Sequence, residues 1–135
     1  MSHYDELPDY MDYDVLNDYF VAFLKKYTDN TNKSNIYYAL EELLELSDRQ
    51  WNTYRLISNE IKIQLEKYIL SIINFDDEMI IDYILCIIPR IGLDISFKHI
   101  QKMMVNINNP YIKDKIEKAI LEYGDSVSNP YSGMW

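Results

Sequence analysis

One helical pattern occurs twice in the sequence, in residues 76–92 and again, 32 residues later, in residues 108–124. In both stretches isoleucines recur at the spacing of one α-helical face, and both end in glycine. The second stretch also carries start and stop signals: Asn109 can cap a helix, Pro110 suits its first position, and Gly124 can close it with a left-handed turn. The two stretches therefore predict two similar helices, each with one buried face.

The same shift relates the segments that precede these helices, so that a pair of helices is repeated. Four apolar residues of the first segment fall on four of the second, namely Leu65, Tyr68, Ile72 and Phe75 on Phe97, Ile100, Met104 and Ile107. The pairs at 61–92 and 93–124 would stack as units of a small α-solenoid, because neither buries its apolar face alone. A more divergent third pair is predicted at 14–47. The alternative is a compact helical bundle, since all amphipathic helices share a period of about 3.6 residues.

Apolar spacing also predicts the helices of the first third of the chain, at about 14–27 and 34–46. The tetrapeptide "SDRQ" then has the pattern of a capping box, with Ser47 and Gln50, and predicts a short connecting helix near 48–57. The chain has only three glycines, which leaves few turns of the kind that hairpins need. We therefore expect an all-α fold.

Length and composition predict one domain. A chain of 135 residues with 48% hydrophobic content can bury a sizeable core, so we expect a single helical domain over 1–135 with an acidic leader at 1–13 and a tail at 125–135. The one cysteine, Cys86, excludes a disulfide within the chain, and its aliphatic neighbours favour a buried, unreactive thiol. No signal peptide and no apolar stretch of about 18 residues is present, so we expect a cytoplasmic protein without membrane association.

The net charge of −9 is concentrated in the first third of the chain. Residues 1–48 carry 11 acidic side chains and three lysines, which leaves a net charge of −8 there and −1 in residues 49–135. A one-signed surface attracts partners of the opposite sign, and it disfavours the phosphate backbone of nucleic acids. We therefore expect a basic protein partner and no nucleic acid. The alternative is a solvated leader that serves solubility alone.

The sequence offers no arrangement typical of catalysis or metal binding. His3 and His99 have no second histidine or cysteine placed to complete a metal site or a catalytic triad. Asp76 and Asp77 are adjacent, so on a helix they diverge by about 100° instead of converging as an acid and base. They suit the cap and first turn of the following helix. We expect no catalytic residue, no cofactor and no metal.

The stretch "FKHIQKMMVNINNPYIKDKIEKAILEYG" resembles a HEAT repeat. It combines an apolar first helix, a turn with Asn-Pro, and a second helix that opens with Ile112 and Lys113 and continues to the small residue Ala119. The preceding unit keeps two aspartates in its turn but has Ile81 where the basic residue would fall. The resemblance covers about 61–124 well and 14–47 loosely, and it implies a solenoid fold.

A narrower resemblance concerns function. A small, acidic, HEAT-like chain rich in isoleucine, asparagine, lysine and tyrosine, which ends in "DSVSNPYSGMW", is similar to the all-helical immunity proteins of bacterial polymorphic and contact-dependent inhibition toxin systems. This resemblance implies a cytoplasmic protein that neutralises one cognate toxin domain by occluding its basic active site. The alternative is a helical protein–protein interaction adaptor or a viral host-interaction protein, which would bind through a groove between helices.

The expected binding residues come from the acidic part of the chain and from the tail. On the helix at 34–46, the residues opposite the apolar face should point outward, and tyrosine and tryptophan outside the predicted core are typical interface anchors. The predicted partner-binding residues are Asp9, Asp12, Asp14, Asp18, Tyr38, Glu41, Glu42, Glu45, Tyr131 and Trp135.

Overall fold

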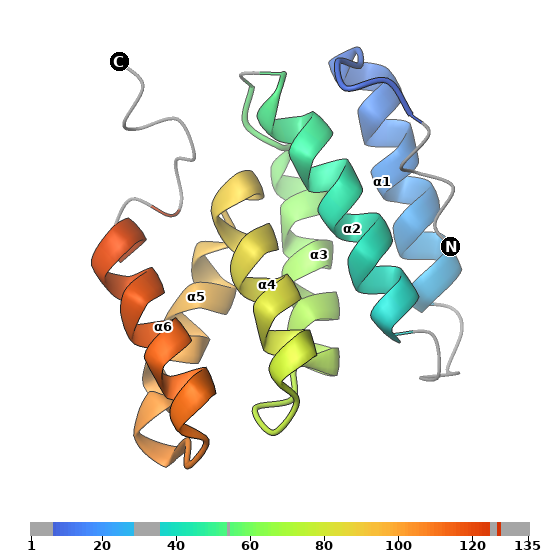
Figure 1. Ribbon diagram of the computed structural model, residues 1–135. Helices are drawn as coiled ribbons and strands as arrows, with labels where there is room; N and C mark the ends of the chain where they lie inside the picture. Colours follow the sequence, from blue (N-terminus) through green and yellow to red (C-terminus); the bar gives the residue numbers. More distant parts are fainter. Residues whose placement is uncertain (1–6, 29–35, 54, 125–126, 128–135) are drawn as a thin grey trace.

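The computed structural model describes residues 7–28, 36–53, 55–124 and Val127, and in these ranges the chain is helical without any strand (Figure 1). The expected all-α class is confirmed. The elements are α1 (Tyr13–Thr28), α2 (Ile36–Trp51), α3 (Asn59–Ile72), α4 (Glu78–Ile91), α5 (Asp94–Met103), the short 3₁₀ helix η3 (Met104–Asn106) and α6 (Pro110–Tyr123).

The helices lie in two layers. In one layer α2 packs against α4 and α4 against α6, and in the other α1 packs against α3 and α3 against α5. Contacts between α1 and α2, α4 and α5, and α5 and α6 join the two layers. In Figure 1 the chain therefore advances from α1 on the right to α6 on the left, and α2, α4 and α6 run side by side.

Local signals in the sequence determine where several helices begin and end. The side chains of Ser58, Asp77 and Asn109 accept hydrogen bonds from backbone amides in the first turns of α3, α4 and α6, as N-caps do. The two described glycines that follow α4 and α6 both have positive φ angles. The left-handed helical conformation itself occurs at Gly92, with φ 76° and ψ 39°, whereas Gly124 has ψ −128°, so the predicted left-handed closure of α6 is wrong in detail.

The predicted connecting helix near 48–57 is wrong, because α2 continues without interruption to Trp51. The Ser47 hydroxyl donates to the carbonyl oxygen of Leu43, 2.7 Å away, and so bonds to the preceding turn instead of capping a new helix. Residues 55–57 that follow are not helical. The extension brings a buried arginine, Arg49, into the same helix as the predicted acidic residues.

The core is made by the apolar faces that the sequence pattern predicts. Aromatic residues of α1 and α3 meet within it, where the rings of Phe23 and Tyr68 pack edge to face with centroids 5.5 Å apart. Val127 is also buried in the core. The largest fully buried side chains are Phe20, Phe23, Leu16, Leu40, Leu43, Leu46, Leu65, Ile69, Ile81, Ile84 and Ile87.

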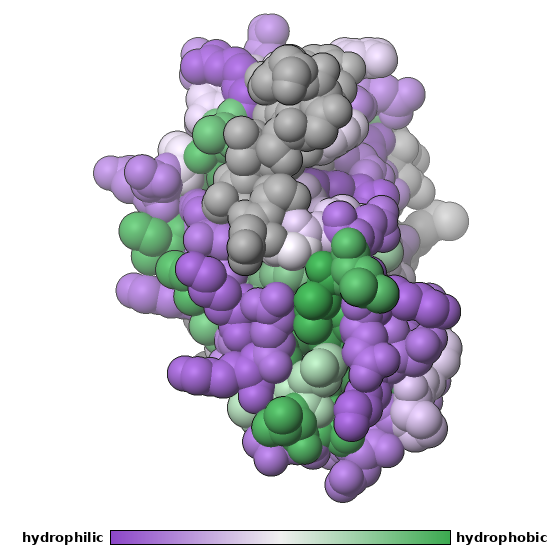
Figure 2. Space-filling model, turned by 90° about the vertical axis from the view of Figure 1, so that its left-hand side faces the viewer, coloured by the Kyte–Doolittle hydropathy of each residue, from purple (hydrophilic) through white to green (hydrophobic). Residues whose placement is uncertain are grey.

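The end of the molecule on the side of α6 exposes apolar surface. Figure 2 shows this side, where apolar regions in green lie between hydrophilic ones. The last helices carry exposed apolar residues, including Ile95 of α5, Val105 of η3 and Leu121 of α6. In the described part of the chain no further helix follows α6 to cover them.

The N-terminus of α5 is capped by a side chain from another helix. Leu93 stands at the N-cap position and provides no side-chain hydrogen bond, but Glu66 of α3 accepts one from the amide of Ser96 at 2.9 Å. A second α3–α5 contact joins Lys62 Nζ to the carboxylate of Asp94 at 2.6 Å. Burial raises the pKa of the Glu66 carboxyl above its ordinary value, and this effect outweighs the opposing effect of the amide hydrogen bond.

We expect Glu66→Gln to make the protein more stable at neutral pH and to change how its stability depends on pH. Because the folded-state pKa of Glu66 is raised, the contribution of this residue to stability is fully present below its unfolded value of 4.5 and is lost as pH rises through the folded-state pKa. Glutamine has no charge to bury and keeps an acceptor for Ser96. Melting temperatures from about pH 4 to 7 test this expectation.

The matched control is Glu60→Gln, because Glu60 lies exposed on the same helix. Its melting temperature should follow that of the wild type at each pH. If the melting temperatures of Glu66→Gln and the wild type changed with pH in parallel, this would contradict the expectation.

Candidate functional site

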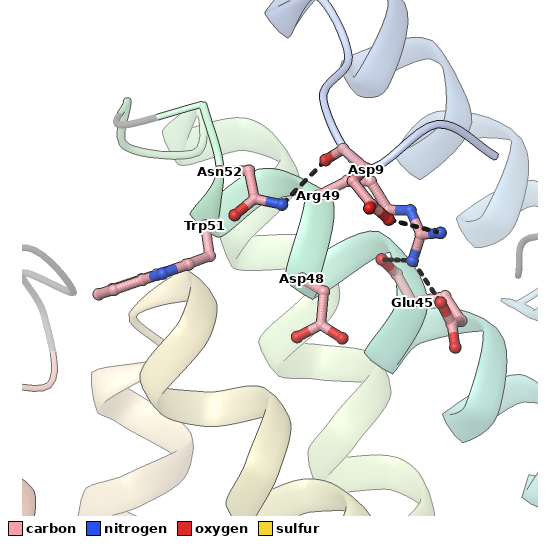
Figure 3. A pocket seen from close by; sticks show the side chains of 6 residues that line it. All are labelled: Asp9, Glu45, Asp48, Arg49, Trp51 and Asn52. Carbon is pink, nitrogen blue, oxygen red and sulfur yellow. Dashed lines mark hydrogen bonds and ion pairs between the residues drawn. The ribbon is translucent and has the colours of Figure 1, made fainter.

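A polar pocket of about 480 Å³ lies where the strap, residues 7–12 ahead of α1, crosses the C-terminal end of α2. Figure 3 shows how its side chains lie, with Arg49 and Trp51 projecting to opposite sides of the helix end. A volume of this size is within the usual range for ligand sites, about 300–1,000 Å³, although such sites are mostly apolar. The pocket is lined by Asp9, Glu45, Asp48, Arg49, Trp51 and Asn52.

Arg49 holds the strap on α2. Its guanidinium is buried and donates to the carbonyl oxygens of Leu7 at 2.9 Å and Pro8 at 3.3 Å. It also donates to the carbonyl oxygen of Glu45 at 3.2 Å and to the carboxylate of the same residue. Asn52 adds a hydrogen bond to the carbonyl oxygen of Asp9 at 2.9 Å (Figure 3). The guanidinium fork thus satisfies strap carbonyls that the strap itself leaves without partners.

The pocket lining carries three carboxylates and one guanidinium. Asp9 is mostly exposed and lies 4.0 Å from Arg49, so its attraction to the arginine is weak. Asp48 pairs with Arg90 of α4 at 2.5 Å, an ion pair that joins neighbouring helices. The lining is therefore rich in hydrogen-bond acceptors and net negative. Chemically it suits an ammonium or guanidinium group from outside.

The structure brings some of the predicted binding residues together and separates others. Asp9 and Glu45 meet at the pocket, and Glu41 lies half-buried one turn before Glu45 on α2. Four of the other predicted residues do not line this pocket but are exposed on the strap, α1 or α2, namely Asp12, Asp14, Asp18 and Tyr38. Asp14 and Asp18 lie on α1 opposite its buried face.

The prediction for Glu42 is wrong, because this side chain was expected to point outward and is instead buried. It faces α1, where Lys26 Nζ lies 3.3 Å from its carboxylate. Burial raises the pKa of the Tyr68 phenol to about 12, and the negative charge of the nearby Glu42 carboxylate contributes to this increase. The reason is that α2 is covered on the α1 side as well as on its apolar face, so a position at the edge of the apolar stripe becomes interior.

Two further predicted residues, Tyr131 and Trp135, lie outside the described residues, so their assignment stays a prediction. Conversely, sequence reasoning missed four residues that line the pocket, namely Asp48, Arg49, Trp51 and Asn52. A signal for Arg49 was present in its spacing of four residues from Glu45, which is typical of an ion pair along one helix. It was overlooked because a new helix was expected to begin at this point.

The prediction that Cys86 is a buried thiol is also wrong, because Cys86 is exposed. It lies with Lys115 and Lys118 in a smaller pocket of about 280 Å³ between α4 and α6. Its sequence neighbours are indeed apolar, but successive residues of a helix point about 100° apart. Ile87 therefore enters the core while Cys86 lies on the outer face of α4.

Comparison with known proteins finds no matching family model, no matching curated protein and no matching solved structure. In the described part of the chain no helix is both long and apolar enough to cross a membrane. The same residues contain no group of three or more histidine, cysteine, aspartate and glutamate side chains arranged to hold a metal ion.

Proposed function

We propose that this protein is a non-catalytic binding protein, specifically an immunity protein that neutralises a cognate toxin domain in the cytoplasm by covering its basic active-site surface. The observation that carries the proposal is the acidic pocket, in which Arg49 holds Glu45 and the strap in place beside Asp48. Carboxylates that are already held in place lose little entropy on binding, and their charge speeds encounter with a basic partner. The resemblance of the sequence to all-helical immunity proteins supports the same function.

We further propose that the six described α-helices form a HEAT-like solenoid of three helical pairs. The alternation of layers supports this, since α1, α3 and α5 pack in one row and α2, α4 and α6 in the other. The helical pair is then the repeating unit, and each pair covers the previous one.

A binding role is also supported by the kind of side chains that line the pocket. They include no cysteine, histidine or serine, the usual nucleophiles and bases of hydrolytic sites. Glu45 and Asp48 each form an ion pair with an arginine. We accordingly propose that the protein acts without cofactor or metal.

The test is neutralisation of the toxin whose gene directly precedes this one in the source genome. Expression of the toxin domain in a bacterial host should stop growth, and co-expression of this protein should restore it. Asp9→Lys/Glu41→Lys should slow association with that toxin about tenfold at low salt, because steering charges act mainly on the association rate. Glu45 is left unchanged, since its reversal would put a lysine beside the buried Arg49.

The matched control is Glu60→Lys/Glu117→Lys, which changes the net charge equally at exposed sites on α3 and α6. It should associate at nearly the wild-type rate. If the preceding gene encodes no toxin, or if growth is not restored, the immunity function is wrong. If the Asp9/Glu41 variant associates as fast as the control, the acidic pocket is not the binding surface.

A further inference from the structure

The N-terminal ends of α2, α4 and α6 lie together at one edge of their layer, the lower edge in Figure 1. Each end exposes a large side chain: Tyr37 is 46% exposed, Met79 55% and Tyr111 41%. We call these three residues the rim. It lies at the opposite end of α2 from the acidic pocket.

Hydrogen bonds hold the two tyrosines of the rim in place. The Tyr37 hydroxyl donates to the carboxylate of Asp77, and the Tyr111 hydroxyl donates to that of Asp82 at 2.9 Å. Both carboxylates belong to α4 or its N-cap, so tyrosines from both neighbouring helices are tied to the middle one. These bonds raise the pKa of both phenols, which keeps the hydroxyls as donors.

Orientation of this kind makes exposed rings effective binding anchors. Single exposed apolar residues are common on protein surfaces and need no explanation. Tyrosine and methionine, however, are enriched at the centres of protein interfaces, and a ring that is already held loses little entropy when a partner covers it. The rim combines these residue types across three adjacent helices.

The surroundings of the rim indicate which partner it fits. The segment 76–82 contains four acidic residues and no lysine or arginine, and Glu78 accepts a hydrogen bond from Asn109 at 3.1 Å. On α6, Lys115 Nζ lies 5.4 Å from the centre of the Tyr111 ring. A partner that covers the rim therefore gains most if it presents aliphatic side chains flanked by arginine or lysine.

We propose that the rim is the apolar anchor of the interface with the basic protein partner. The inference rests on the proposed function, because it extends the footprint of the same partner along α2. Glu41 lies one turn from Tyr37 and Glu45 one turn further, so two partly exposed side chains of α2 lie between the rim and the pocket. The pocket supplies charge, and the rim supplies the apolar area that slows dissociation.

Two fluorescent peptides test the rim without knowledge of the natural partner. Both contain six arginines, and they differ in three further residues, which are leucines in one and serines in the other. Fluorescence anisotropy at low salt should show that the wild type binds the leucine peptide about tenfold more tightly than the serine peptide. Tyr37→Ser/Met79→Ser should bind both peptides with nearly equal affinity.

The matched control is Val105→Ser/Leu121→Ser, which removes two side chains that are 80% and 87% exposed outside the rim. It should keep the preference for the leucine peptide. If the rim variant keeps this preference too, or if the control loses it, the rim is not the anchor. Met79→Ser alone repeats the test if the double variant melts early, because methionine makes no strong hydrogen bond that could be lost.

The same peptides separate this inference from the proposed function. Asp9→Lys/Glu41→Lys should weaken the binding of both peptides by a similar factor, because both carry the same charge. Unchanged binding of the serine peptide to that variant would contradict the role of the acidic pocket. The preference of the wild type for the leucine peptide over the serine peptide would still test the rim by itself.

Discussion

Ile84→Ala is expected to lower the free energy of unfolding by about 4 kcal/mol. Ile84 is fully buried in α4, the helix that packs against α2, α5 and α6. Truncation removes apolar contacts and leaves a cavity that three surrounding helices are too constrained to fill. This loss would be a large part of the total free energy of unfolding, which is about 5–15 kcal/mol for native proteins. Urea denaturation followed by circular dichroism measures it.

The control for this prediction is Ile63→Ala on α3, where the isoleucine side chain is 51% exposed. Its effect should stay below about 1 kcal/mol, because a half-exposed residue leaves little cavity. If Ile84→Ala and Ile63→Ala lower the free energy of unfolding by the same amount, the packing described around α4 is incorrect.

Arg49→Met is expected to cost about 3 kcal/mol of unfolding free energy. Methionine keeps much of the aliphatic stem but loses the donors to Leu7, Pro8 and Glu45. Each hydrogen bond to a charged group contributes about 1.5–3 kcal/mol, and water can replace part of this at the strap. The strap should also detach, so that chymotrypsin cleaves after Tyr10 faster than in the wild type.

Lys113→Met on α6 serves as the control, because it removes an exposed cation. Its unfolding free energy should change by about 0.5 kcal/mol or less. A strap that resists chymotrypsin equally in Arg49→Met and in the control would show that the arginine does not hold it.

The helices themselves could be predicted from the sequence because the interactions that form them are local. Caps such as Asp77 and Asn109 bond to amides two or three residues away, and Gly92 ends α4 by its own backbone conformation. The apolar spacing of residues such as Leu16 and Ile84 depends only on the helical period. All of these signals lie within a few turns of the chain, so the all-α class and the core faces follow from sequence.

The sequence also led us to predict Asp9 and Glu45 as binding residues, but it did not indicate the contacts with Arg49 that join them. Asp9 and Arg49 are 40 positions apart, and no local pattern indicates that the strap crosses the end of α2. The same holds for the rim, where Tyr37 and Asp77 meet across two helices. Such pairs depend on the packing order of the helices.

Only the tertiary structure determined whether the side chains at the edges of each apolar face are buried or exposed. A helical period assigns an inner and an outer side, but a helix in a layer has neighbours on two or three sides. Glu42 therefore became interior beside α1, while Cys86 remained outside between α4 and α6. Residue type and spacing determined the helices and their inner faces, and the positions of neighbouring helices determined which remaining side chains form the acidic pocket and the rim.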